Sequence, residues 1–119
     1  MEILNLTQHK ATEEQIVAGV VEPRQKSEVQ AILTFGDLPS REEIAARAER
    51  LAEIADEEGA VAAMIGGAPY LMGPLEAALR HKMIIPYYAY SRRESVEEPT
   101  PDGGVRKTAV FRHVGFVVA

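Results

Sequence analysis

The sequence contains no cysteine, and this absence excludes several kinds of chemistry. The chain can form no disulfide, no thiolate nucleophile and no cysteine-ligated zinc or iron–sulfur centre. Its three histidines and its carboxylates do not recur at metal-ligand spacing, which argues against a metal site of another kind. We therefore expect a protein without a bound metal, in keeping with a reducing compartment.

The sequence also lacks a long apolar run and an excess of basic residues. No segment approaches the roughly 20 apolar residues of a membrane helix, and the start of the chain does not pair a basic region with a hydrophobic stretch. The formal net charge of −5 opposes a broad surface for duplex DNA, which would neutralise many phosphates at once. We expect a cytoplasmic protein that contacts neither membranes nor duplex DNA, while a local basic pocket stays open as an alternative.

The chain does contain enough apolar residues for one core. Its 119 residues are 46% apolar, a size and composition typical of a single domain. Apolar segments near Ile3–Leu6, Ala60–Ile65 and Ile84–Tyr90 predict three buried strands. We therefore expect one domain, residues 1–119, built around these strands.

Capping patterns between the strands predict helices. The segment Thr12-Glu13-Glu14-Gln15 is a capping box that predicts a short helix. Ser40-Arg41-Glu42-Glu43 repeats the pattern and predicts a second helix, with Gly59 as its stop signal. Ala68-Pro69 can open a third helix. Proline and glycine interrupt residues 20–38, and we expect this segment to be partly irregular.

Strands joined by helices require right-handed crossovers and therefore a parallel core sheet. The turn signal Pro101-Asp102-Gly103-Gly104 predicts a β-hairpin at the C-terminal end. The predicted fold is a three-layer, Rossmann-like α/β domain with a parallel core sheet and a C-terminal β-hairpin. In such sheets, ligands bind outside the carboxyl ends of the strands. Three loops leave those ends in this chain: Thr7-Gln8-His9, Gly66-Gly67-Ala68 and Ser91-Arg92-Arg93.

The glycine loop is one candidate site. Gly66 and Gly67 precede a predicted helix start, so backbone amides and the positive end of the helix dipole could hold an anion. The pattern matches neither the Walker phosphate loop nor the three-glycine dinucleotide fingerprint, which disfavours ATP and NAD. We expect no cofactor, and a plain tight turn is the alternative interpretation of the two glycines.

The loop after the third strand offers cationic and hydroxyl donors. Arg92 or Arg93 could clamp a phosphate with bidentate bonds, and the hydroxyls of Ser91 and Ser95 could add neutral ones. Adjacent residues on a strand point to opposite faces, so at most one arginine would enter the cleft. Alternatively, both arginines are exposed and pair with nearby glutamates.

His9 is the histidine predicted at a strand end. An imidazole near neutral pH can transfer a proton or donate to phosphate, which makes His9 the first catalytic candidate. A capping or merely exposed histidine is the alternative. Tyr70 adjoins the glycine loop and could stack on a base, although aromatic residues also serve in core packing.

The first strand and its loop resemble a known family. The segment Leu4-Asn5-Leu6-Thr7-Gln8-His9-Lys10-Ala11-Thr12-Glu13-Glu14-Gln15 is similar to the corresponding part of the small stand-alone ring nucleases of CRISPR systems. These are relatives of the CRISPR-associated Rossmann-fold (CARF) sensor domains. The rest of the chain matches in layout alone, and many unrelated proteins share that layout.

This resemblance implies a CARF-like fold and a homodimer that holds a cyclic oligoadenylate across its two-fold axis. It also implies metal-independent attack of a ribose 2′-hydroxyl on the adjacent phosphate, which needs a bent ligand and donors for the developing charge. Thr7, Gln8 and the Gly66-Gly67 amides would position this ligand. His9 would transfer a proton or donate to phosphate, and one residue of Arg92-Arg93 would stabilise charge.

Three other function classes stay open. The protein could bind the same kind of nucleotide without turnover, as a sponge or sensor. It could be a defence-related interaction module, whose sign would be a broad exposed apolar patch. An enzyme acting on ordinary nucleosides or sugars is disfavoured, because the sequence shows no paired carboxylates at a suggestive spacing.

Overall fold

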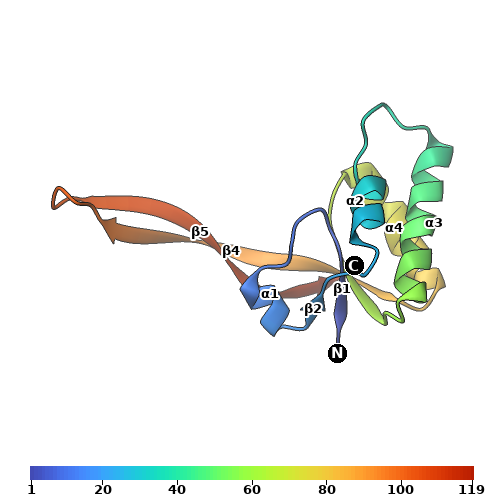
Figure 1. The fold of residues 1–119 in the computed structure, drawn as a ribbon, viewed down its shortest axis with the longest axis horizontal. Coiled ribbons are helices and arrows are strands. Elements are labelled where there is room, and N and C mark those ends of the chain that lie inside the picture. Colours follow the sequence, from blue (N-terminus) through green and yellow to red (C-terminus); the bar gives the residue numbers. More distant parts are fainter.

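A mixed five-stranded sheet forms the centre of the fold, seen in a computed structural model that describes residues 1–119 (Figure 1). Its strands are β1 (Ile3–Leu6), β2 (Val20–Val21), β3 (Ala62–Ile65), β4 (Ile85–Pro99) and β5 (Val105–Val118). They lie in the order β2-β1-β3-β4-β5. All neighbours run parallel except β4 and β5, which are antiparallel. The chain therefore has an α/β fold in which the three predicted core strands lie side by side.

Four helices connect the strands: α1 (Glu13–Val17), α2 (Lys26–Leu33), α3 (Arg41–Glu57) and α4 (Pro69–His81). Thr12 caps α1, and both bonds of the capping box are present. The hydroxyl of Ser40 accepts from the backbone N–H of Glu43 at 3.1 Å and caps α3. Pro74 lies inside α4 and does not delay its start at Pro69. The helix ends thus follow local signals in the sequence.

The helices cover the two faces of the sheet unequally. Buried residues of α2, α3 and α4 form one cluster with alternate residues of β1 and β3, such as Leu6 and Ile65. The opposite face has a smaller cluster of five residues, among them Ile3 and Met64. No residue of α1 is buried, because this helix has only five residues. One face of the sheet therefore carries a thick helical layer, whereas the other face has a thin cover.

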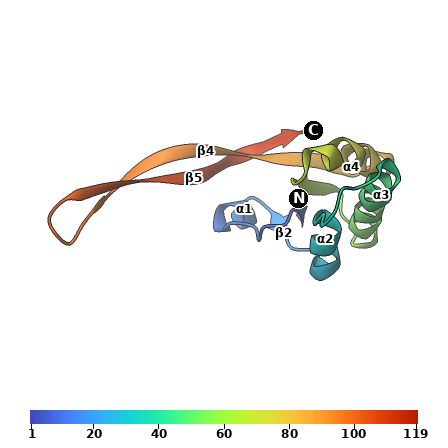
Figure 2. The same ribbon diagram turned by 90° about the horizontal axis from the view of Figure 1, so that it is seen from above.

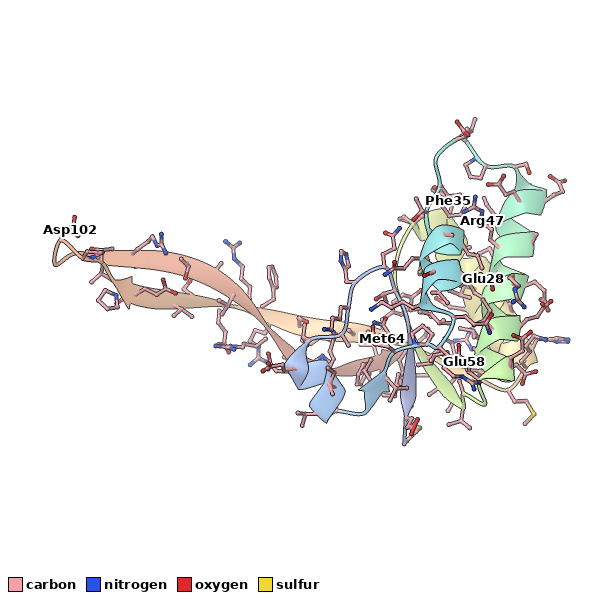
Figure 3. All side chains as sticks on the ribbon, viewed as in Figure 1. Glu28, Phe35, Arg47, Glu58, Met64 and Asp102 are labelled. Carbon is pink, nitrogen blue, oxygen red and sulfur yellow. The ribbon has the colours of Figure 1, made fainter.

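β4 and β5 extend beyond the rest of the sheet as a two-stranded arm, residues 88–117. β3 pairs with β4 only as far as Tyr87, whereas β4 and β5 pair with each other out to Pro99 and Val105. Figures 1 and 2 show the arm projecting away from the helices, and Figure 3 places Asp102 at its tip. The radius of gyration is 16.9 Å, against about 13.5 Å for a compact domain of this length. The excess reflects the arm.

Two segments differ from the sequence-based expectation. β4 does not end near Tyr90 but continues to Pro99, so Ser91-Arg92-Arg93 lies in a strand and not in a loop. The segment expected to be partly irregular contains β2 and α2. Beyond its base, β4 is exposed from Tyr90 to Pro99 except at Val96, and these mainly polar residues therefore resemble a loop until the partner strand is known. No helix has the length and apolar content needed to cross a membrane.

Candidate functional site

A cavity of about 400 Å³ opens where β1 and β3 end. One wall is the loop Thr7–Lys10, and another is the glycine loop Gly66-Gly67. Tyr88 and Ala89 of β4 add a third wall. Because β1 and β3 run parallel, their carboxyl ends meet at this edge, where β4 passes beside them and continues into the arm. The structure thus brings two of the three predicted loops to one cavity.

A buried asparagine holds the loop after β1. Asn5 is 1% exposed, and its Nδ2 donates to the backbone oxygen of His9 at 2.8 Å and to both carboxylate oxygens of Glu22 at 3.0 Å. Its Oδ1 accepts from the backbone N–H of Thr7 at 3.0 Å and from the Thr7 hydroxyl at 2.6 Å. This role of Asn5 was not predicted, although an amide within the apolar run Ile3–Leu6 was a signal.

Basic groups lie at the cavity without acidic neighbours. His9 and Lys10 are exposed lining residues, and no hydrogen bond or ion pair engages the imidazole or the ammonium group within the chain. No aspartate or glutamate lines the cavity, although the chain carries a formal net charge of −5. No carboxylate of the lining offsets the charge of Lys10, and such a lining attracts an anionic ligand.

The glycine loop has a backbone that other residues adopt rarely. Gly67 has a φ of 146°, and a Cβ added at Gly66 would lie 3.5 Å from Cγ2 of Thr7. The loop leads into α4, whose N-terminus has no side-chain cap. The positive end of the helix dipole therefore lies directly after the loop, where it favours an anion.

Three other polar lining residues are engaged within the protein. The amide nitrogen of Gln8 donates to the backbone oxygen of Leu33 at 3.3 Å and to the hydroxyl of Thr34 at 2.9 Å. Thr12 and Gln15 bond each other in the capping box of α1. The side-chain amide of Gln8 therefore anchors the loop to the end of α2. A contact between Gln8 and a ligand stays a prediction.

The remaining predicted residues do not line the cavity. The ring of Tyr70 packs edge-on against Phe35, with centroids 5.1 Å apart, and Ala68 is the N-cap of α4. Ser91-Arg92-Arg93 and Ser95 lie along the arm in β4. The expected convergence of three loops thus holds for two, because β4 stays paired with β5 where a loop was expected.

Tyr88 supports the cavity wall from β4. Its hydroxyl donates to Oε2 of Glu76 on α4 at 2.6 Å. Burial, and then the hydrogen bond to Glu76, raise the pKa of Tyr88 to about 12. The phenol is therefore protonated at neutral pH and links α4 to the sheet.

The other two histidines lie outside the cavity. His81 ends α4 and is exposed, whereas His113 of β5 packs against Phe116 with ring centroids 4.7 Å apart. No group of three or more histidine, aspartate or glutamate side chains is arranged to hold a metal ion. The imidazole at the cavity is that of His9.

Comparison with known proteins finds a family model that matches residues 1–117, with the description uncharacterized protein MJ1673 family. The match covers the cavity and the arm alike. No curated protein and no solved structure matches the chain.

Proposed function

The chain belongs to the MJ1673 family, and we propose that it binds and cleaves a cyclic oligoadenylate in the cavity between β1 and β3. The proposal joins the resemblance to the small CRISPR-associated ring nucleases with the geometry of the cavity. One observation carries it: His9 and Lys10 meet the glycine loop at a cavity that contains no carboxylate. A CARF-like, Rossmann-like fold, a homodimer and a cytoplasmic location belong to the same proposal.

In the proposed reaction, a ribose 2′-hydroxyl of the ligand attacks the adjacent phosphorus. The new bond from the 2′ oxygen to phosphorus forms while the bond from phosphorus to the 5′ oxygen breaks. The products are a 2′,3′-cyclic phosphate and a 5′-hydroxyl, and the proton of the 2′-hydroxyl passes overall to the 5′ oxygen. The protein therefore needs to bend the ligand for in-line attack and to stabilise charge on the phosphate.

The residues at the cavity divide these tasks. His9 transfers the proton or donates to the phosphate. Lys10 and the amides of Gly66-Gly67 hold the phosphate, and Thr7 helps to fix the loop through its bonds to Asn5. Lys10 takes the charge-stabilising role that sequence analysis gave to Arg92 or Arg93, because both arginines lie on the arm.

Binding without turnover is the second candidate function. No side chain makes a hydrogen bond to the imidazole of His9 and orients it, whereas a general base is usually held in place by a third group. A sponge or sensor needs only the basic lining and the glycine loop. The two functions share the ligand and differ in whether the ring is opened.

Incubation with cyclic oligoadenylates of several ring sizes, followed by chromatography, tests the proposal. Linear products that end in a 2′,3′-cyclic phosphate, formed equally well with EDTA, support cleavage by the ligand's own hydroxyl. Tight binding with the ring returned intact would favour the sponge. Absence of binding would overturn both functions, and loss of cleavage with EDTA would overturn the mechanism.

A variant of His9 tests the assignment of the catalytic group. His9→Ala should fold and bind nearly normally but lose about 100-fold in single-turnover rate, the usual scale of general acid–base help. His81→Ala is the matched control, because His81 is exposed at the end of α4 and should leave the rate unchanged. A small loss of single-turnover rate in His9→Ala would mean that His9 positions the ligand and does not transfer the proton.

A further inference from the structure

One edge of β4 has no neighbouring strand along the arm. β3 pairs with β4 only at Ile85, Pro86 and Tyr87, while β5 pairs with the opposite edge as far as Pro99. An isolated two-stranded ribbon is marginally stable in water, and a long free edge is a template for another strand. The arm therefore offers one strand edge to a partner.

Hydrogen bonds at the base of β4 show which residues face this edge. Ile85 N donates to Val61 O on the β3 side at 3.0 Å, and Pro86 O accepts from Ala119 N on the β5 side at 2.9 Å. The register shift after Tyr90 adds a residue on β5 and leaves the alternation of β4 intact. Odd-numbered residues of β4 therefore direct their backbone groups to the free edge. Along the arm these include Ser91, Arg93, Ser95 and Glu97.

The charges along this edge are self-complementary about Ser95. Arg92-Arg93 precedes Ser95, and Glu97-Glu98 follows it at the same two distances. In an antiparallel pair of two β4 strands with a two-fold axis at Ser95, Arg93 faces the partner's Glu97. Arg92 likewise faces the partner's Glu98. Opposite charges at directly opposed positions stabilise an antiparallel pair.

Within one chain, these arginines have no anionic partner. Arg92 lies opposite Arg112 and Arg93 opposite Phe111, and Phe111 is 71% exposed. Arg112 pairs instead with Glu94 at 3.6 Å. Like charges directly opposite each other destabilise a strand pair. A second β4 strand would supply two carboxylates that β5 does not: Glu97, which makes no ion pair within its own chain, and Glu98, which also pairs with Arg106 of its own chain at 3.3 Å.

The outer edge of β5 suits a second copy less well. Its Lys and Arg residues are Arg106, Lys107 and Arg112, and the strand contains no acidic residue. Self-pairing of β5 would therefore bring cations together without a carboxylate to offset them. The charge pattern favours the β4 edge.

We propose that two copies of this chain pair through the free edges of β4, antiparallel about Ser95, so that the two arms form one four-stranded sheet. This pairing is the contact that would form the homodimer of the proposed function. The pairing can be tested without a ligand. Ala89 lines the cavity and lies six residues before Ser95. The two cavities then lie about 40 Å apart along the strands. Each copy binds its own ligand, unlike the shared site that the resemblance implies.

A single cysteine tests the register, because the chain has none of its own. Cα atoms of a hydrogen-bonded antiparallel pair are about 5.5 Å apart, within disulfide range. Ser95→Cys should form a covalent dimer under mild oxidation, seen on a non-reducing gel. Ser91→Cys should stay largely uncrosslinked, because it faces the partner's Pro99. Equal crosslinking of both variants, or none in Ser95→Cys, would overturn the register.

Charge reversal tests the complementarity. Arg92→Glu with Arg93→Glu in one protein, and Glu97→Arg with Glu98→Arg in another, should each weaken self-association by at least about tenfold in analytical ultracentrifugation. An equimolar mixture should form a mixed dimer, because every opposed pair then has opposite signs. Circular dichroism confirms that each variant is folded. A monomeric wild type at high concentration, or a mixture that stays monomeric, would overturn the proposal.

Ligand binding separates this proposal from the proposed function. The variant with Glu97→Arg and Glu98→Arg should retain its affinity for a cyclic oligoadenylate, because neither glutamate lines the cavity. A dimeric wild type that binds no cyclic oligoadenylate would retain the arm contact and reject the proposed function. A monomeric wild type that cleaves the ring would reject the arm contact and the homodimer but retain the proposed cleavage.

Discussion

The side-chain nitrogen of Asn5 donates to the backbone oxygen of His9 at 2.8 Å. This bond joins a buried position of β1 to the candidate catalytic loop. The same side chain binds the backbone and the hydroxyl of Thr7. One residue in the core therefore fixes the loop that brings an imidazole to the cavity.

Asn5→Ala should lower the free energy of unfolding by about 2 to 3 kcal/mol, because partly buried donors and acceptors lose their partner. Urea denaturation followed by circular dichroism measures the change. Gln30→Ala is the control, since the Gln30 side chain makes no hydrogen bond, and it should shift stability by less than about 0.5 kcal/mol. Equal stability of Asn5→Ala and the wild type would contradict the role given to Asn5.

Gly67→Ala should destabilise the protein by about 1 to 3 kcal/mol, since its φ of 146° is strained for any other residue. It should also weaken ligand binding by disturbing the glycine loop. Gly73→Ala makes the same chemical change inside α4, where an added Cβ meets nothing within 4 Å. That control should raise stability by up to about 1 kcal/mol. Thermal melts that rank the two variants in the opposite order would exclude the strain argument.

Lys10→Ala should weaken the affinity for a cyclic oligoadenylate by at least about tenfold, because it removes a charge-assisted bond to phosphate. Isothermal titration calorimetry measures the dissociation constant. Lys107→Ala removes the same charge from the arm and should leave the affinity unchanged. If both variants lose affinity equally, the net charge of the protein matters more than the cavity does.

Tyr88 should make stability fall in alkali. Its pKa is raised to about 12 in the folded protein, so the unfolded chain loses the phenolic proton first. The resulting stabilisation is complete below a pH of 10.0, the ordinary pKa, and is lost between that value and about pH 12. Denaturant titrations across this range should show the decline in the wild type. Tyr88→Phe should lack this component, and an identical decline in both would assign it to other groups.

Sequence patterns located the cavity because its two main loops follow from local signals. Apolar runs mark the strands, and the caps at Thr12 and Ser40 mark helices between them, so the strands are expected to run parallel. This arrangement places the loop of residues 7–9 beside the glycine loop. The extent of β4 could not be predicted in this way, because an arm with solvent on both faces has no buried stripe. The amide within the apolar run marked Asn5 as unusual, but its partner could not be predicted, since Glu22 meets it only in the folded sheet.

The outer strand of the arm determines whether a paired sheet can keep growing. When two arms join through β4, a β5 strand remains at each margin of the four-stranded sheet. Both margins carry Arg106, Lys107 and Arg112 and no acidic residue of β5, although Glu98 and Glu94 of β4 pair with Arg106 and Arg112. The β5 margin of another pair would therefore bring side chains of the same sign against them. Natural β-sheets use such charged edges to prevent repeated edge-to-edge pairing with further chains. An assembly paired in this way would therefore close at two copies instead of propagating as a fibril.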